Sequence, residues 1–247
     1  MIIYFLIGSI GGLLSGLLGI GGGAIIVPLL TYLTKSDFKT NTGISSLAVV
    51  LIATGSSITY IFNDYSNGSN FIFEILIIVI GGIVGSYLGS KLTAKLSTPL
   101  LKKIFSLLLA ASAFRIIFSS TVSSGFENNV ILYFIVGFVS GVGSGLLGIG
   151  GGIIRIPMLI FFGGFEQIIA QGISLIATIP SALTAAITKI RNDRQLIKIG
   201  LIVGVFGILG SIIGGNLTLN IIPREILNIS FGIFLIFVSI NMFVSNK

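Results

Sequence analysis

Two glycine clusters are the segments of this sequence with the clearest capacity for chemistry. GLLGIGGGAIIVP at 16–28 returns as GLLGIGGGIIRIP at 145–157, with ten of thirteen residues identical. A run of glycines ends a helix and adopts backbone conformations that other residues avoid. The apolar run after each cluster predicts a short second helix. Its first amides lack intrahelical partners and carry the positive end of the helix dipole, an arrangement that favours an anion.

We therefore expect both clusters to bind an anionic substrate through their backbone amides. The glycines concerned are Gly19, Gly21, Gly22, Gly23, Gly148, Gly150, Gly151 and Gly152. The alternative is a packing bend whose amides are satisfied by neighbouring helices.

Arg155 places a cation three residues after the second cluster, where the first copy has Ile26. A charge in an otherwise apolar helix is costly and usually marks a functional site or an ion pair. We expect Arg155 to contact the anion directly or through water. The alternatives are a side chain that extends away to solvent, or a pair with Glu127 or Glu166.

Polar residues open the helix that follows each hairpin. Helical spacing puts Thr42 with Ser45, and Gln171 with Ser174, on common faces. We expect their hydroxyl and amide groups to contribute to substrate binding, and interhelical hydrogen bonding is the alternative. The polar residues further along the two helices are Thr54, Ser56, Ser57, Thr178, Ser181 and Thr184.

The chain contains neither cysteine nor histidine. It therefore lacks thiols and the usual ligands of zinc, copper and haem. A GSG sequence at 143–145 has no histidine to act as the base of a serine protease. We expect no enzyme, no catalytic residue, no metal and no cofactor.

The elements that must position these residues are membrane helices. The 247 residues are 54% hydrophobic and 9% charged, with a mean hydropathy of +1.13, which is too little charge for a soluble domain. Apolar runs of about 20 residues match a hydrocarbon layer of about 30 Å. We predict an all-α polytopic membrane protein. The net charge of +7 is assigned to loops, so the expected partners are the lipid bilayer and a small anion, with no nucleic acid.

The clusters belong to an internal duplication with an offset of 129 residues. Each repeat is predicted to contain a glycine-broken re-entrant helical hairpin and three transmembrane helices. The first repeat, 1–118, has its hairpin at 2–34 and its spans at 41–62, 71–92 and 99–118. After a linker at 119–129, the second repeat, 130–247, has its hairpin at 130–163 and its spans at 168–189, 196–218 and 224–244.

The distribution of basic residues predicts that the repeats are inverted. Loop 91–103 has four lysines, whereas its counterpart 214–225 has only Arg224; loop 63–70 has no basic residue, whereas 189–198 has four. The positive-inside rule then places the two termini in the cytoplasm and gives each hairpin no net crossing. The N-terminus lacks a basic region and a cleavage site, so we expect no cleaved signal peptide. We expect a multi-pass protein of the plasma membrane.

The doubled motif is similar to that of a known family. The GxGGGxxxxP-like stretches at 19–28 and 148–157, each followed by a short acidic-containing loop and GIS at 43–45 and 172–174, resemble the sulfite exporter TauE/SafE family. GSYLG at 85–89 and GSIIG at 210–214 resemble its later glycine motif. The resemblance implies transport of a small anion such as sulfite, thiosulfate or a sulfonate like sulfoacetate.

We therefore expect a transporter of a sulfur oxyanion or organosulfonate that works by alternating access around a midplane site between the glycine breaks. A channel-like anion pore and a non-transporting membrane subunit are the alternatives. No Asp or Glu lies in the interior of a predicted span, since Glu74 and Glu225 are within four residues of a span end. The sequence leaves open the coupling ion, H⁺ or Na⁺, and the formation of a homo-oligomer.

Overall fold

The computed structural model describes residues 1–34, 36–62, 71–97, 99–100, 103, 106–107, 110, 113–114, 129–191 and 193–244, and this part of the chain contains no strand. Its helices are α1 (Ile2–Leu18), α2 (Gly23–Thr34), α3 (Phe38–Phe62), α4 (Ile72–Lys95), α6 (Val130–Leu147), α7 (Gly152–Gly163), α8 (Gln167–Ile190), α9 (Arg194–Asn220) and α10 (Arg224–Val244). Among them α3, α4, α6, α8 and α9 are long and apolar enough to cross a membrane. The predicted all-α polytopic membrane fold is confirmed. The expected span at 99–118 and the linker lie largely outside the described residues.

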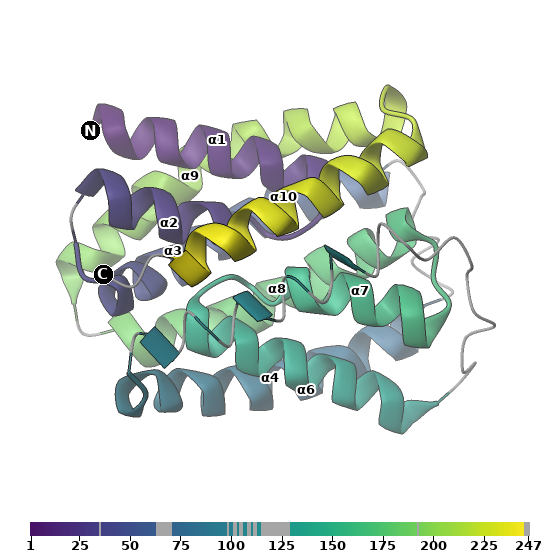
Figure 1. Ribbon diagram of the computed structural model, residues 1–247, viewed down its shortest axis with the longest axis horizontal. Coiled ribbons are helices and arrows are strands. Elements are labelled where there is room, and N and C mark those ends of the chain that lie inside the picture. Colours follow the sequence, from purple (N-terminus) through teal and green to yellow (C-terminus); the bar gives the residue numbers. More distant parts are fainter. Residues whose placement is uncertain are drawn as a thin grey trace.

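The glycine clusters separate α1 from α2 and α6 from α7. Gly19 (φ 69°) and Gly148 (φ 68°) take the left-handed conformation and end the first helix of each pair, with their amides donating to the carbonyls of Ser15 and Ser144. After the break, α2 and α7 lie toward opposite ends of the molecule (Figure 1). The start of α1 and the end of α10 lie toward the same end.

The central helices are α3 and α8. Neighbouring helices pack in the order α1, α9, α3, α8, α4, α6. If each helix is exchanged for its counterpart in the other repeat, α1 for α6, α9 for α4 and α3 for α8, the same order results, read backwards. Each repeat therefore packs its first helix on a helix of the other repeat, and α3 and α8 meet in the middle.

Glycines allow these cross-repeat helix pairs to approach closely. A Cβ atom on Gly8, Gly12 or Gly16 of α1 would overlap the carbonyl oxygen of Val203, Gly207 or Ser211 of α9. On α6, a Cβ on Gly137, Gly141 or Gly145 would overlap the carbonyl oxygen of Ile78, Gly82 or Ser86 of α4. Both pairs thus use the same spacing of small residues, one helical turn apart.

Gly12→Ala is expected to destabilise the fold by at least about 2 kcal/mol, because the added methyl group meets rigid backbone and forces α1 away from α9. The unfolding midpoint of the purified protein in detergent measures this loss. The matched control is Ile10→Ala on the same helix, whose side chain is 45% exposed and should cost about 0.5 kcal/mol or less. Equal midpoints for the two variants would contradict the close contact.

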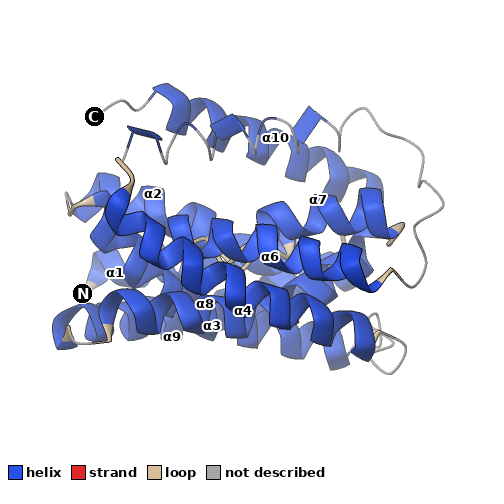
Figure 2. Ribbon diagram, turned by 90° about the horizontal axis from the view of Figure 1, so that it is seen from below, coloured by secondary structure: helices blue, strands red, loops and turns tan. Residues whose placement is uncertain are grey.

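The last helix lies to one side of the others (Figure 2). Its Asn241 side chain accepts a hydrogen bond from the Tyr32 hydroxyl of α2, and the Ser239 hydroxyl donates to the carbonyl of Ser106. Helix α10 therefore covers the assembly of the other helices and does not line its centre.

Candidate functional site

The two glycine breaks meet at the centre of the molecule. A Cβ atom on Gly23 would be 2.5 Å from the Cα atom of Ile149, and one on Gly152 would be 2.8 Å from the carbonyl oxygen of Ile20. Each break therefore packs backbone to backbone against the other, and only glycine fits at these contacts.

The breaks are held between α3 and α8. Gly21 (φ 79°) and Gly150 (φ 80°) both lie against the side chains of Val49 and Thr178. Val49 of α3 and Thr178 of α8 are equivalent positions of the two repeats. Four elements thus form the centre of the molecule, and each repeat contributes one break and one long helix.

Helix α7 begins at this centre. Its first intrahelical bonds run from the amides of Ile154 and Arg155 to the carbonyl of Gly151, at 3.1 and 2.9 Å. The amides of Gly152 and Ile153 come before these and have no intrahelical acceptor. Helix α2 begins in the same way, with the amides of Ile25 and Ile26 bonded to the carbonyl of Gly22. Two positive dipole ends therefore meet in one place.

Arg155 is fully buried beside these helix ends, with 0% of its surface exposed. Its Nε donates to the Ser140 hydroxyl at 3.1 Å, and its Nη1 donates to the Ser174 carbonyl at 2.9 Å and the Thr178 hydroxyl at 3.1 Å. A long bond of 3.5 Å joins Nη2 to the Ser181 hydroxyl. These bonds use four of the five guanidinium donors and leave one on Nη2, whose nitrogen would lie 3.3 Å from a Cβ atom built on Gly151.

No carboxylate among the described residues balances the charge of Arg155. All four acceptors are uncharged, and within the described part of the chain no Asp or Glu oxygen lies within 4.0 Å of the guanidinium. The alternative pair with Glu166 is not formed, and Glu127 lies outside the described residues. A buried, unpaired cation is costly unless another charge offsets it, so this centre favours an anion.

The surroundings of Arg155 differ from those of its counterpart in a coordinated way. Where the second repeat has Arg155, Ser140, Thr178 and Ser181, the first has Ile26, Gly11, Val49 and Ile52. Ile26 and Ile52 belong to a buried apolar cluster, and Gly11 makes room for Ile26. One repeat therefore has a polar pocket built for a cation, and the other has an apolar pocket of the same layout.

Three buried hydroxyls near the breaks have no hydrogen-bond partner among the described residues. They are the side chains of Ser15, Ser144 and Ser174, each with 0% exposure. Ser15 and Ser144 are equivalent residues in the last turns of α1 and α6, and the carbonyl of Ser174 contacts Arg155. Buried polar atoms are normally satisfied, so these three are available donors for a ligand.

The other predicted polar residues hold the ends of the hairpin helices. The Ser45 hydroxyl donates to the carbonyl of Gly148 at 2.9 Å, and the Gln171 amide donates to the carbonyl of Leu18 at 3.2 Å. Thr42 donates to the carbonyl of Lys39 and accepts a hydrogen bond from the Lys189 ammonium. Of the four residues predicted with the glycines, only Ser174 lies next to Arg155; the role of the other three in substrate binding stays a prediction.

Ser140, Tyr60 and Lys189 carry no local motif that marks them in the sequence. Ser140 could have been found by aligning the two repeats and selecting positions that are polar in one copy and small or apolar in the other. The same comparison marks Thr178 and Ser181. It also places Tyr60 and Lys189 at equivalent positions, but the contacts of these two residues become clear only in the structure.

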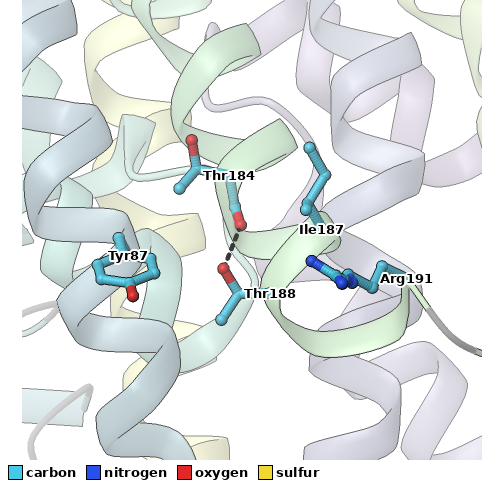
Figure 3. Close-up of a pocket in the computed structure, with 5 residues that line it drawn as sticks. All are labelled: Tyr87, Thr184, Ile187, Thr188 and Arg191. Carbon is cyan, nitrogen blue, oxygen red and sulfur yellow. Dashed lines mark hydrogen bonds between the residues drawn. The ribbon is translucent and has the colours of Figure 1, made fainter.

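A separate cavity of about 460 Å³ lies on another face of α8, lined by Tyr87, Thr184, Ile187, Thr188 and Arg191 (Figure 3). The Thr188 hydroxyl there donates to the carbonyl of Thr184 at 2.7 Å. None of its lining residues contacts Arg155, so this cavity is distinct from the centre between the breaks.

These features define a polytopic helical membrane protein with a positively charged, buried centre between two broken helices. The chain belongs to the sulfite exporter TauE/SafE family, whose model matches residues 1–116 and 133–247. The resemblance seen in the sequence is thereby confirmed.

Two similar curated proteins are both named as probable membrane transporter proteins. One, from Methanocaldococcus jannaschii, is 32% identical over 162 residues, which cover 62% of this chain and 59% of that protein. The other, from Bacillus subtilis, is 28% identical over 124 residues, which cover 47% of this chain and 45% of that protein. The chain spans about half the length of these relatives in the matches.

Proposed function

We propose that this protein transports a small anion across the membrane by alternating access, with the substrate held between the two glycine breaks. The substrate class is a sulfur oxyanion or organosulfonate, such as sulfite, thiosulfate or sulfoacetate. The protein acts in the plasma membrane with its termini in the cytoplasm. The family and the names of its relatives support transport, and the chemistry of the centre supports an anion.

The observation that carries this proposal is the environment of Arg155. A guanidinium that is fully buried among three hydroxyls and one carbonyl has no counter-charge from the part of the chain that the structure describes. A sulfite or sulfonate group brings a negative charge and several oxygen acceptors. It can accept from the remaining Nη2 donor, the Ser174 hydroxyl and the amides of Gly152 and Ile153.

The arrangement of the helices supports a rocking motion between two inverted repeats. The order of neighbouring helices is the same from either end, and α2 and α7 extend toward opposite ends of the molecule. Inverted repeats allow one sequence pattern to form an inward-open and an outward-open state by exchanging the conformations of its two halves. The site between the breaks would stay at the centre of the protein in both states.

Thermal unfolding in the presence of different anions tests the site without assuming a direction of transport. A ligand at a hundred times its dissociation constant is expected to stabilise the folded protein by about 2.7 kcal/mol. The panel is sulfite, thiosulfate, sulfoacetate, sulfate, phosphate, acetate and chloride at equal ionic strength. We expect stabilisation by at least one sulfur oxyanion or sulfonate and none by chloride. Failure of every anion to raise the midpoint would contradict the anion site.

A further inference from the structure

Lys189 is a second, partly buried cation for which the described residues supply no counter-charge. Its Nζ donates to the Thr42 hydroxyl at 2.9 Å and, over a longer 3.5 Å, to the carbonyl of Leu146. Within the described residues no carboxylate oxygen lies within 4.0 Å of this ammonium. An ammonium has three donors, so one is not used by these two contacts.

Lys189 lies on the face of α8 that also bears Thr178, a partner of Arg155. The two residues are about three turns apart, or about 16 Å along the axis. The residues between them on this face are the buried Ala182, Ala185 and Ala186. Small, uncharged side chains therefore separate the central cation from Lys189, which is only half-buried.

The first repeat has the same contact without a charge. Tyr60 of α3 is equivalent to Lys189, and Gln171 of α8 is equivalent to Thr42. The Tyr60 hydroxyl donates to the Gln171 Oε1 atom at 3.0 Å, and Tyr60 is 1% exposed. At one end of α3 and α8 the contact between them is thus formed by neutral, buried groups, and at the other end it includes a partly exposed cation.

We propose that Lys189, together with Thr42, forms a second anion-binding subsite for the sulfur oxyanion or sulfonate that binds at Arg155. This inference rests on the proposed function, from which the ligand class is taken. The anion reaches Lys189 first from the end of the molecule where α8 ends, exchanges part of its hydration for the ammonium and the Thr42 hydroxyl, and continues to the guanidinium. Tyr60 leaves the equivalent contact at the opposite end without a cation, so the two ends of the path differ in their attraction for anions.

A purely structural role for Lys189 makes a different prediction. A lysine near the end of a helix can cap its last carbonyls, here that of Leu146 in α6. A glutamine at this position keeps an amide donor for that carbonyl but removes the charge. Lys189→Gln therefore separates capping from anion attraction, and Lys189→Arg restores the charge.

The natural absence of cysteine permits a direct test on the full chain. Ala186→Cys places a thiol one turn before Lys189 on the same face. The rates of modification by the anionic sulfonatoethyl and the cationic trimethylammonioethyl methanethiosulfonates are measured, each divided by the reagent's rate with a free thiol. We expect the anionic reagent to react at least tenfold faster on this scale. Lys189→Gln should lower the ratio about tenfold, whereas Lys189→Arg should keep it.

The matched control is Arg191→Gln, which removes a cation at the same end of α8 but from the side that lines the cavity of Figure 3. This change should leave the ratio within twofold. An unreactive thiol, a ratio unchanged by Lys189→Gln, or an equal fall with Arg191→Gln would each overturn the subsite. Size-exclusion chromatography of each variant serves as the control for folding.

The outcome is separable from the proposed function because modification needs no transport. A ratio that depends on Lys189 in a protein without anion flux would retain the subsite and refute the transporter. Flux that depends on Arg155, with a ratio insensitive to Lys189, would retain the transporter and refute the subsite.

Discussion

Replacement of Arg155 by methionine is expected to weaken binding of the stabilising anion by about a hundredfold, because loss of a buried charged donor costs about 3 kcal/mol. The fold should tolerate this change. The hydroxyls of Ser140, Thr178 and Ser181 keep their own acceptors, the carbonyls of Gly137, Gly150 and Ala177. Methionine also removes the cost of burying an unpaired charge, and its flexible apolar chain fills the part of the pocket that the arginine stem occupies.

Titration calorimetry with the anion selected by thermal unfolding measures this loss. Ile26→Met is the matched control, because Ile26 is equally buried at the equivalent position of the first repeat. It should leave the dissociation constant within about threefold, since it changes no charge near the site. Arg155→Met with unchanged affinity would show that the anion binds elsewhere and would reduce Arg155 to a structural role.

Gly150→Ala is expected to destabilise the protein by about 2–5 kcal/mol, which combines the cost of a left-handed alanine with that of overpacking. The added Cβ would be 2.7 Å from Val49 and 2.8 Å from Thr178, between the two central helices. Because Thr178 is also bonded to Arg155 at 3.1 Å, anion affinity should fall in the same variant.

Chemical unfolding in detergent gives the free-energy change, and Gly164→Ala separates its two causes. Gly164 also has a positive φ, 69°, but follows α7 at the periphery and is partly exposed. It should lose only about 1–2 kcal/mol, the cost of the backbone conformation alone. If Gly150→Ala were no more harmful than Gly164→Ala, the tight packing of the break between α3 and α8 would be refuted.

The helical membrane class was predictable because it depends on composition and on the lengths of apolar runs, which are local properties. The glycine breaks were predictable as well, since Gly19 and Gly148 take the left-handed conformation for which a glycine run is suited. Arg155 stood out because an internal duplication supplies its own comparison, with Ile26 at the equivalent position.

The partners of these residues were not predictable from local pattern. The bond from Ser45 to Gly148 joins residues 103 apart, and that from Gln171 to Leu18 joins residues 153 apart. Such pairs depend on how each repeat packs on the other. The pocket of Arg155 was partly predictable, because the repeat that contains Arg155 has Ser140 and Thr178 where the other repeat has Gly11 and Val49. That these changes belong to one pocket becomes evident only in the structure, where the side chains are in contact.

The most direct test of the transporter is counterflow in liposomes that contain the purified protein. Vesicles loaded with a high concentration of the selected unlabelled anion are diluted into a trace of the labelled anion. Alternating access around one site predicts a transient accumulation of label above equilibrium in wild-type vesicles, saturable with external anion, and its absence with Arg155→Met. Label that only equilibrates, at a rate proportional to concentration and equal in the Arg155→Met protein, would contradict the account and indicate a pore or a protein without transport activity.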